Sequence, residues 1–140
     1  MEQETVRLNL TKPGNIPYVE LYHNKTPFRF VIDTGSTLSW TRVDVAAAFI
    51  MNKESGYDNI VANGEQLPVV TATLRMQPSN GTPDDYTAIK FRAKFACGEG
   101  TKKINEMNEV LETEIHGILG SDFLIDNSLK VDLSNLEMVV

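Results

Sequence analysis

The sequence predicts a mainly β fold with one or two short helices, in which the sheet closes or folds over to hide its edges. Two observations predict this class. Many short runs alternate apolar and polar residues, as half-buried strands do, and turn-forming dipeptides such as Pro13-Gly14 and Asn63-Gly64 separate them. Only short stretches show helical spacing. Because exposed strand edges invite aggregation, we expect a mainly antiparallel sheet that covers them.

The first part of the chain predicts three strands joined by turns. Alternation over Val6–Leu10 predicts the first strand. Pro13-Gly14 suits a tight turn, because proline presets φ and glycine tolerates a positive φ, so a hairpin to a second strand at Tyr18–Tyr22 is expected. A third strand over Phe28–Ile32 then places Asp33 where a strand opens into a loop.

The middle of the chain predicts a short helix and a hairpin. Leu38–Trp40 resumes as a strand, and Asp44 is a suitable N-cap for an alanine-rich helix that stops near Gly56. Two β-type runs between residues 57 and 76 flank Asn63-Gly64, which suits a type I′ turn because both residues tolerate a positive φ. This dipeptide is the clearest hairpin signal in the chain.

The last part of the chain predicts strands around two less regular segments. An amphipathic strand is expected over residues 89–97. The acidic segment 102–114 has apolar residues at helix-like spacing, and its pattern leaves a helical turn and an extended loop both open. Beyond it we expect an apolar strand, a short helix and a terminal strand pair, over 115–119, from Ser121, and over 129–133 and 136–140.

Composition limits the classes of function. A length of 140 residues, with 41% hydrophobic and 23% charged, fits a single globular domain over residues 1–140. The net charge of −6 disfavours nucleic acid and anionic lipid as partners. No apolar stretch is long enough to span a bilayer, and no signal peptide is visible. The single cysteine, Cys97, cannot form a disulfide within the chain, which slightly favours a cytoplasmic location.

Two motifs carry the functional argument. An apolar strand runs into Asp33-Thr34-Gly35-Ser36, and a second element, Ile118-Leu119-Gly120, follows late in the chain before a short Ser-Asp-Phe-Leu helix. Together these resemble the active-site motif and the hydrophobic-hydrophobic-glycine motif of the retropepsin-like aspartic proteases. The order of strands, hairpin and terminal strand pair extends the resemblance over nearly the whole chain.

The resemblance implies a fold, an activity and an assembly. The fold would be the closed β-barrel of the acid proteases, and the activity endopeptidase cleavage of a peptide or protein substrate. Asp33 would be catalytic, with Thr34, Gly35 and Ser36 supporting it: Thr34 by bonding the opposite loop, and Ser36 by bonding the outer oxygen of Asp33. Since the chain supplies one such aspartate, a homodimer is implied, with the segments 6–10 and 136–140 at its interface.

Further implications concern the substrate cleft and the chemistry. Ala62, Asn63 and Gly64 would form the flap over an extended peptide, and Ile118, Leu119 and Gly120 would pass beneath the catalytic loop. Two carboxylates sharing one proton need no cofactor and no metal, and activity should follow a bell-shaped dependence on pH with an acidic optimum.

Alternatives remain open at several residues. Asp33 would also suit a plain Asx turn, in which the carboxylate bonds the backbone two residues on. Asp122 is a conceivable second acid, but a place in the first turn of a helix explains it better. His23 and His116 lack partners at metal-ligand spacing and are expected at the surface or at strand ends. The whole chain would also suit a non-catalytic dimeric peptide-binding module, or one lobe of a longer pepsin-like protease.

Overall fold

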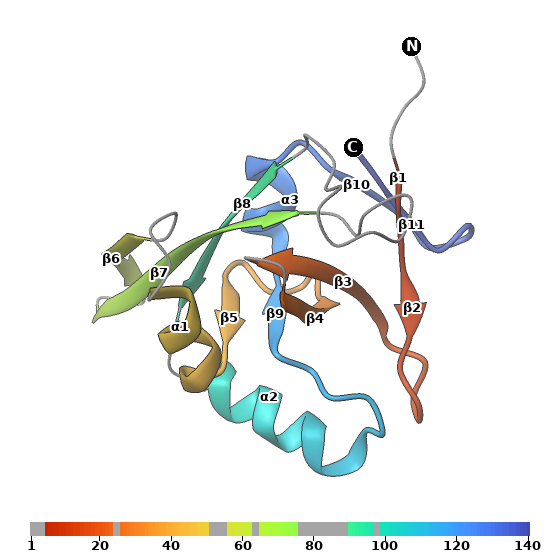
Figure 1. Cartoon of the computed structure of the whole chain (residues 1–140), viewed down its shortest axis with the longest axis horizontal. Helices are drawn as coiled ribbons and strands as arrows, with labels where there is room; N and C mark the ends of the chain where they lie inside the picture. Colours follow the sequence, from red (N-terminus) through yellow and green to blue (C-terminus); the bar gives the residue numbers. More distant parts are fainter. Residues whose placement is uncertain (1–4, 24–25, 51–55, 63–64, 76–89, 97–98) are drawn as a thin grey trace.

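The structure is a computed structural model that describes residues 5–23, 26–50, 56–62, 65–75, 90–96 and 99–140. The described part of the chain forms eleven strands and three helices (Figure 1). The strands are β1 (Thr5–Arg7), β2 (Asn9–Leu10), β3 (Pro17–His23), β4 (Thr26–Ile32), β5 (Ser39–Thr41), β6 (Gly56–Ala62), β7 (Glu65–Arg75), β8 (Lys90–Ala96), β9 (Gly117–Leu119), β10 (Lys130–Asp132) and β11 (Glu137–Val139). The helices are α1 (Val43–Ile50), α2 (Glu99–Val110) and α3 (Ser121–Asp126).

A closed mixed barrel is the main architecture. Eight strands are hydrogen-bonded in the order β2-β3-β4-β9-β5-β8-β7-β6, and a further pairing of β3 with β7 closes six of them into a ring. Most neighbours are antiparallel, but β9 pairs in parallel with β4, and β5 in parallel with β8. The predicted mainly β, closed fold is therefore confirmed, with two parallel pairings inside it.

Aromatic side chains fill the barrel. The alternation of β4 and β8 turns Phe30 and Phe95 inward, where their rings stack with centroids 5.3 Å apart. Phe49 of α1 packs against Phe95 at 5.6 Å, so this helix closes one side of the core. In Figure 1, α1 lies against β7, and α2 lies at the lower ends of β5 and β9, which it contacts.

The N-terminal strand is divided between two sheets. The sequence predicts one strand over residues 6–10, but β1 pairs with β11 in a separate three-stranded sheet, and β2 pairs with β3 in the barrel. Between them the Leu8 N–H donates to the Leu136 carbonyl at 2.8 Å. Alternation continues through this point because Val6 and Leu8 are both buried, so the sequence pattern does not reveal the change of sheet.

The described residues form three helices, where the sequence predicted one or two short ones. The open segment 102–114 forms most of α2, whose Ile104 packs with Ile115 and Ile118 in a second apolar cluster. α1 begins at Val43, so Asp44 lies in its first turn and not at the N-cap, and its carboxylate binds Arg42. None of the described helices is long and apolar enough to cross a bilayer.

The turns that the sequence predicts agree where they are described. Gly14 has a φ of +96°, as its place after Pro13 requires. β6 and β7 pair with Ala62 opposite Glu65, which confirms the hairpin, while Asn63 and Gly64 themselves lie outside the described residues. Cys97 also lies outside them.

Candidate active site

Asp33 lies directly after β4, on the loop that leads to β5. Its backbone N–H donates to the Leu119 carbonyl at 3.0 Å, which ties the start of this loop to β9. Its carboxylate is 32% exposed, and Oδ1 accepts a bond from the Gly35 N–H at 3.1 Å. This is the local hydrogen bond of an Asx turn, so the structure contains the turn that the sequence left open as an alternative at Asp33. The turn leaves the second oxygen, Oδ2, free to meet other groups.

The second motif passes directly beneath this loop. β9 lies between β4 and β5, with Leu119 opposite Ile32, and the Ser121 N–H donates to the Ser36 carbonyl at 2.8 Å. A Cβ on Gly120 would lie 2.6 Å from the Ser36 carbonyl oxygen and also against the Leu38 carbonyl oxygen. The φ of Gly120 is −93°, which any residue adopts, so glycine is required here for close approach of the backbones.

A buried hydroxyl and a carboxylate join the loop to α3. Ser39 is fully buried, and its Oγ donates to Asp122 Oδ1 at 2.7 Å while it accepts the Gly120 N–H at 2.9 Å. Asp122 also accepts the Phe123 N–H at 2.7 Å, as a carboxylate in the first turn of a helix does. The expected helix position of Asp122 is confirmed. Ser39 was missed, although a serine between Leu38 and Trp40 in an apolar strand is a usable signal.

The residues that follow Asp33 have different surroundings from those expected. Ser36 Oγ donates to the Leu38 carbonyl at 2.7 Å, where a bond to the outer oxygen of Asp33 was expected. The reason is local, since the turn brings the carbonyl two residues on within reach of the hydroxyl. Thr34 is exposed, and a Cβ on Gly35 would meet Asp33 Oδ1 at 3.3 Å.

A lysine contacts the second oxygen of Asp33. Lys103 of α2 places its Nζ 3.3 Å from Asp33 Oδ2, with the two side chains 59% and 32% exposed. Such an exposed ion pair contributes little to stability, but it sets a positive charge beside the carboxylate. The sequence did not identify Lys103, because the structure of its segment was left open and the contact joins residues far apart in the chain.

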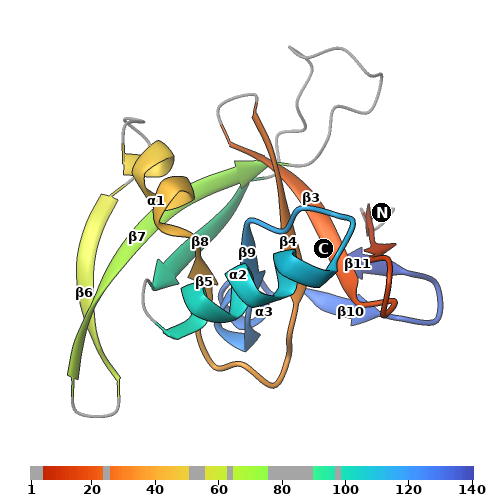
Figure 2. The ribbon, with the colours of Figure 1, turned by 90° about the horizontal axis from the view of Figure 1, so that it is seen from below.

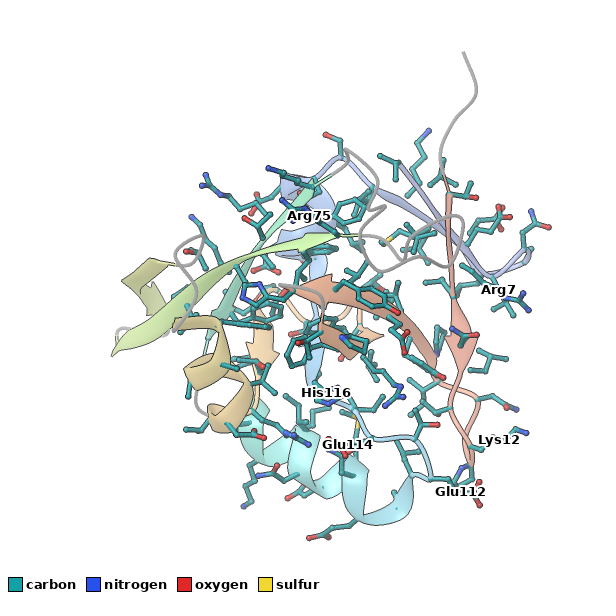
Figure 3. The ribbon with its side chains drawn as sticks, viewed as in Figure 1. Arg7, Lys12, Arg75, Glu112, Glu114 and His116 are labelled. Carbon is teal, nitrogen blue, oxygen red and sulfur yellow. The ribbon has the colours of Figure 1, made fainter. Side chains whose placement is uncertain are left out.

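A charged cluster lies at the opposite end of β9. The Arg29 N–H donates to His116 Nδ1 at 3.0 Å, so the proton of the neutral ring is on Nε2, which lies 3.1 Å from Glu114 (Figure 3). Arg42 binds the same Glu114 at 3.2 Å and Asp44 at 2.8 Å. Burial, and then the positive charge of Arg42, lower the pKa of His116, whereas hydrogen bonding to Arg42 lowers the pKa of Asp44.

The two histidines lie at strand ends and are largely buried, in partial agreement with expectation. His23 ends β3 and is 4% exposed, with Nδ1 3.2 Å from the Thr73 carbonyl and its ring against Phe49. His116 comes directly before β9. Within the described ranges, no group of three His, Cys, Asp or Glu side chains is arranged to hold a metal ion.

Comparison with known proteins reveals a likeness in structure. No family model matches the chain, and no curated protein matches it. Among solved structures, the chain is similar to a retropepsin-like aspartic protease from Rickettsia conorii, with 13% sequence identity and a TM-score of 0.55. The match covers 99% of this chain and 94% of the other. At this identity the likeness shows the fold.

Proposed function

We propose that the chain is one subunit of a homodimeric aspartic endopeptidase whose catalytic group is Asp33. The observation that carries this proposal is the placement of Asp33. A partly exposed carboxylate follows a buried strand, its N–H is tied to Leu119, and Gly120 passes beneath the loop. The barrel has the fold of a protein whose described activity is that of an aspartic protease.

The chemistry requires two such carboxylates close together. One Asp33 is ionised and takes a proton from a water held between them, while the other is protonated and gives its proton to the peptide carbonyl oxygen. The water oxygen bonds to the carbonyl carbon, and the C–N bond of the resulting diol breaks as the first Asp33 gives its proton to the amine nitrogen. The second Asp33 regains a proton from a diol hydroxyl, which becomes part of the new carboxyl group. No covalent intermediate with the protein forms.

Neighbouring residues have supporting roles in this proposal. Thr34 is exposed and free to bond the opposite loop, and Gly35 keeps the space between the two loops open. Ser36 acts through the turn, since its hydroxyl fixes the Leu38 carbonyl. The β6–β7 hairpin, whose paired residues end at Ala62 just before Asn63 and Gly64 in the sequence, covers an extended peptide substrate.

The direct test is Asp33→Asn, compared with Asp126→Asn as a matched control on the exposed face of α3. Asp33→Asn is nearly isosteric, so we expect cleavage of an unfolded protein to fall by at least about a thousandfold with an unchanged thermal melt. Asp126→Asn should cleave at the original rate. Equal cleavage by the two variants would reject Asp33 as the catalytic group.

A non-catalytic peptide-binding module is the second candidate, and the Lys103 contact favours it. Lys103 Nζ lies 3.3 Å from Asp33 Oδ2, the oxygen that the proposed catalytic pair would need for its water. If the chain is a protease, Lys103→Gln removes this contact from Asp33 Oδ2, and the variant should cleave at least as fast as the original chain. If the chain only binds, neither protein cleaves, and an extended peptide labelled with a fluorophore still binds to both.

A further inference from the structure

The helix α2 holds the backbone of Lys103 at a fixed place beside the candidate site. Ile104 is fully buried in the second apolar cluster. The Thr101 hydroxyl donates at 2.7 Å to the carbonyl that ends β5, and Asn108 exchanges two bonds of 2.7 Å with the backbone of Ile115. In Figure 2, α2 crosses in front of β9, which it contacts, and the segment that joins β4 to β5 extends below it. The Lys103 side chain therefore moves only within the length of its own stem.

The contact between Lys103 and Asp33 is one that a substrate is able to displace. Nζ lies 3.3 Å from Asp33 Oδ2, and the two side chains are 59% and 32% exposed. Because such exposed pairs contribute little to stability, exchange of Asp33 for another anion costs little. Nζ lies at Asp33 although Glu106 is three residues along the helix, a spacing that allows an ion pair. Lys103 thus supplies an exchangeable cation where a peptide bond would meet Asp33.

We propose that Lys103 is a specificity-determining residue, which selects substrates that carry Asp or Glu next to the cleaved bond. This inference rests on the proposed protease function and names a substrate class for it. The water held between two Asp33 carboxylates needs Oδ2, so the ammonium group leaves that oxygen when a peptide binds. A carboxylate on the adjacent substrate residue then takes the place of Asp33 as the partner of Nζ.

Acidic substrate side chains need such a cation in order to be accepted at this site. The active Asp33 pair retains a negative charge, and the whole chain has a net charge of −6, so both repel a carboxylate. Salt screens distant surface charges over about 10 Å, whereas an ion pair in contact is screened much less. In a homodimer each copy contributes its own Lys103, so symmetry sets one lysine on each side of the scissile bond. The preference therefore applies to the residues on both sides.

Cleavage of matched peptides tests this preference. Cut sites are first mapped by mass spectrometry in a reduced and alkylated protein, and the fastest site is then synthesised with Glu, Gln or Lys on either side of the bond. We expect kcat/KM of the original chain to be about fivefold higher for Glu than for Gln. Lys103→Gln should lower this ratio to about one or less, and Lys103→Glu should favour the Lys peptide instead.

Lys102→Gln is the matched control, because Lys102 is an exposed lysine on the same helix and the change in net charge is the same. This variant should keep the fivefold ratio. A purely structural role of Lys103 would change the rates for the Glu and Gln peptides equally and leave their ratio unaltered. Cleavage of a whole unfolded protein sums over many bonds that lack acidic neighbours, so the ratio, rather than the total rate, reports the role of Lys103.

The outcomes separate this inference from the proposed function. If the original chain cuts the Glu and Gln peptides equally, or if Lys103→Gln keeps the ratio, the inference is overturned while the Asp33 chemistry stands. If no peptide is cut, the proposed function fails, and binding decides the role of Lys103. Fluorophore-labelled decapeptides of Val and Ala with a central Glu or Gln are then titrated into the original chain and Lys103→Gln. Tighter binding of the Glu peptide that is lost in the variant supports acidic selection by Lys103, and equal binding of both peptides overturns it.

Discussion

The two ends of β9 are fixed by different kinds of interaction. At the Gly120 end, beside Asp33, backbones touch and a buried Ser39 hydroxyl joins Gly120 to Asp122. At the His116 end, a histidine, two acids and an arginine meet near the surface. The difference suggests that the end near the candidate site depends on steric fit, which is insensitive to pH, whereas the other end depends on groups that titrate.

The largest expected effect is at the steric end. Gly120→Ala places a Cβ against two backbone carbonyls that strands hold in place, and should lower the free energy of unfolding by about 3 kcal/mol or more. Gly117→Ala is the matched change at the other end, where a Cβ would meet the Trp40 carbonyl oxygen at 2.7 Å and the Phe30 ring at 2.9 Å. We expect a smaller loss of about 1–3 kcal/mol, because this Cβ meets one backbone carbonyl where the Cβ at Gly120 meets two, and the Phe30 ring is able to shift.

Urea denaturation of both alanine variants measures this contrast. Equal losses would mean that the two ends are equally constrained, and the steric distinction would fail. A stable Gly120→Ala variant would show that the loop shifts away from β9 at small cost.

The next largest effect concerns the buried hydroxyl. Ser39→Ala removes a donor to Asp122 and the acceptor of the Gly120 N–H, and should cost about 2 kcal/mol of unfolding free energy. Asp122→Asn keeps an oxygen in place and should cost about 1 kcal/mol. The same urea experiment compares the two variants. If Ser39→Ala leaves the free energy of unfolding unchanged, the hydrogen bonds of the Ser39 hydroxyl contribute little to the stability of this end of β9.

The pH dependence of stability should arise at the other end. The pKa of His116 in the folded chain lies below its ordinary value of 6.5, so the folded state favours the neutral ring. This contribution to stability is complete above about pH 6.5 and is lost as the pH falls from there through the lowered pKa. Protonation of Nδ1 also removes the acceptor of the Arg29 N–H.

His116→Asn tests this prediction, since its side-chain oxygen is able to accept the Arg29 N–H without titrating. Melting temperatures measured from pH 5 to pH 8 should fall toward acid in the original chain and change less in the variant. The pKa values of Asp44 and Asp132 are both lowered from 3.8, so these carboxylates contribute to stability throughout this pH range and lose that contribution only at more acidic pH. If the melting temperatures of the original chain and of His116→Asn fall in parallel toward acid, the acid sensitivity arises from groups other than His116.

The smallest expected effect is at Arg42. Its ion pairs with Asp44 and Glu114 are largely exposed on the acidic side, so Arg42→Met should change the free energy of unfolding by no more than about 1 kcal/mol. The variant should nevertheless raise the pKa of His116 toward 6.5, because the positive charge of Arg42 helps to lower it. Titration of the His116 ring by NMR measures this shift. A His116 pKa that does not move in the variant would leave burial, with the charge of Arg29, as the cause of its low value.

Elements with strong local patterns are those that the sequence predicted well. The alternation that ends at Asp33, the hairpin between β6 and β7, and the strand pair β10–β11 depend on spacing and turn residues, which act between neighbours. The mainly β, closed class followed from the same local signals. The sequence also singled out Asp33 and Gly120 as residues of two separate motifs, and the structure brings these motifs together through bonds from Asp33 to Leu119 and from Ser121 to Ser36.

Contacts between distant residues were decided only by the tertiary structure. Closure of the barrel brings β9 between β4 and β5, and this step joins Ser39 to Asp122 and sets the Arg29 N–H on His116. Packing of α2 on the second apolar cluster places Lys103 at Asp33. Periodicity in a sequence reports which face of an element is apolar, but the element that covers that face is chosen by the free energy of packing the whole chain.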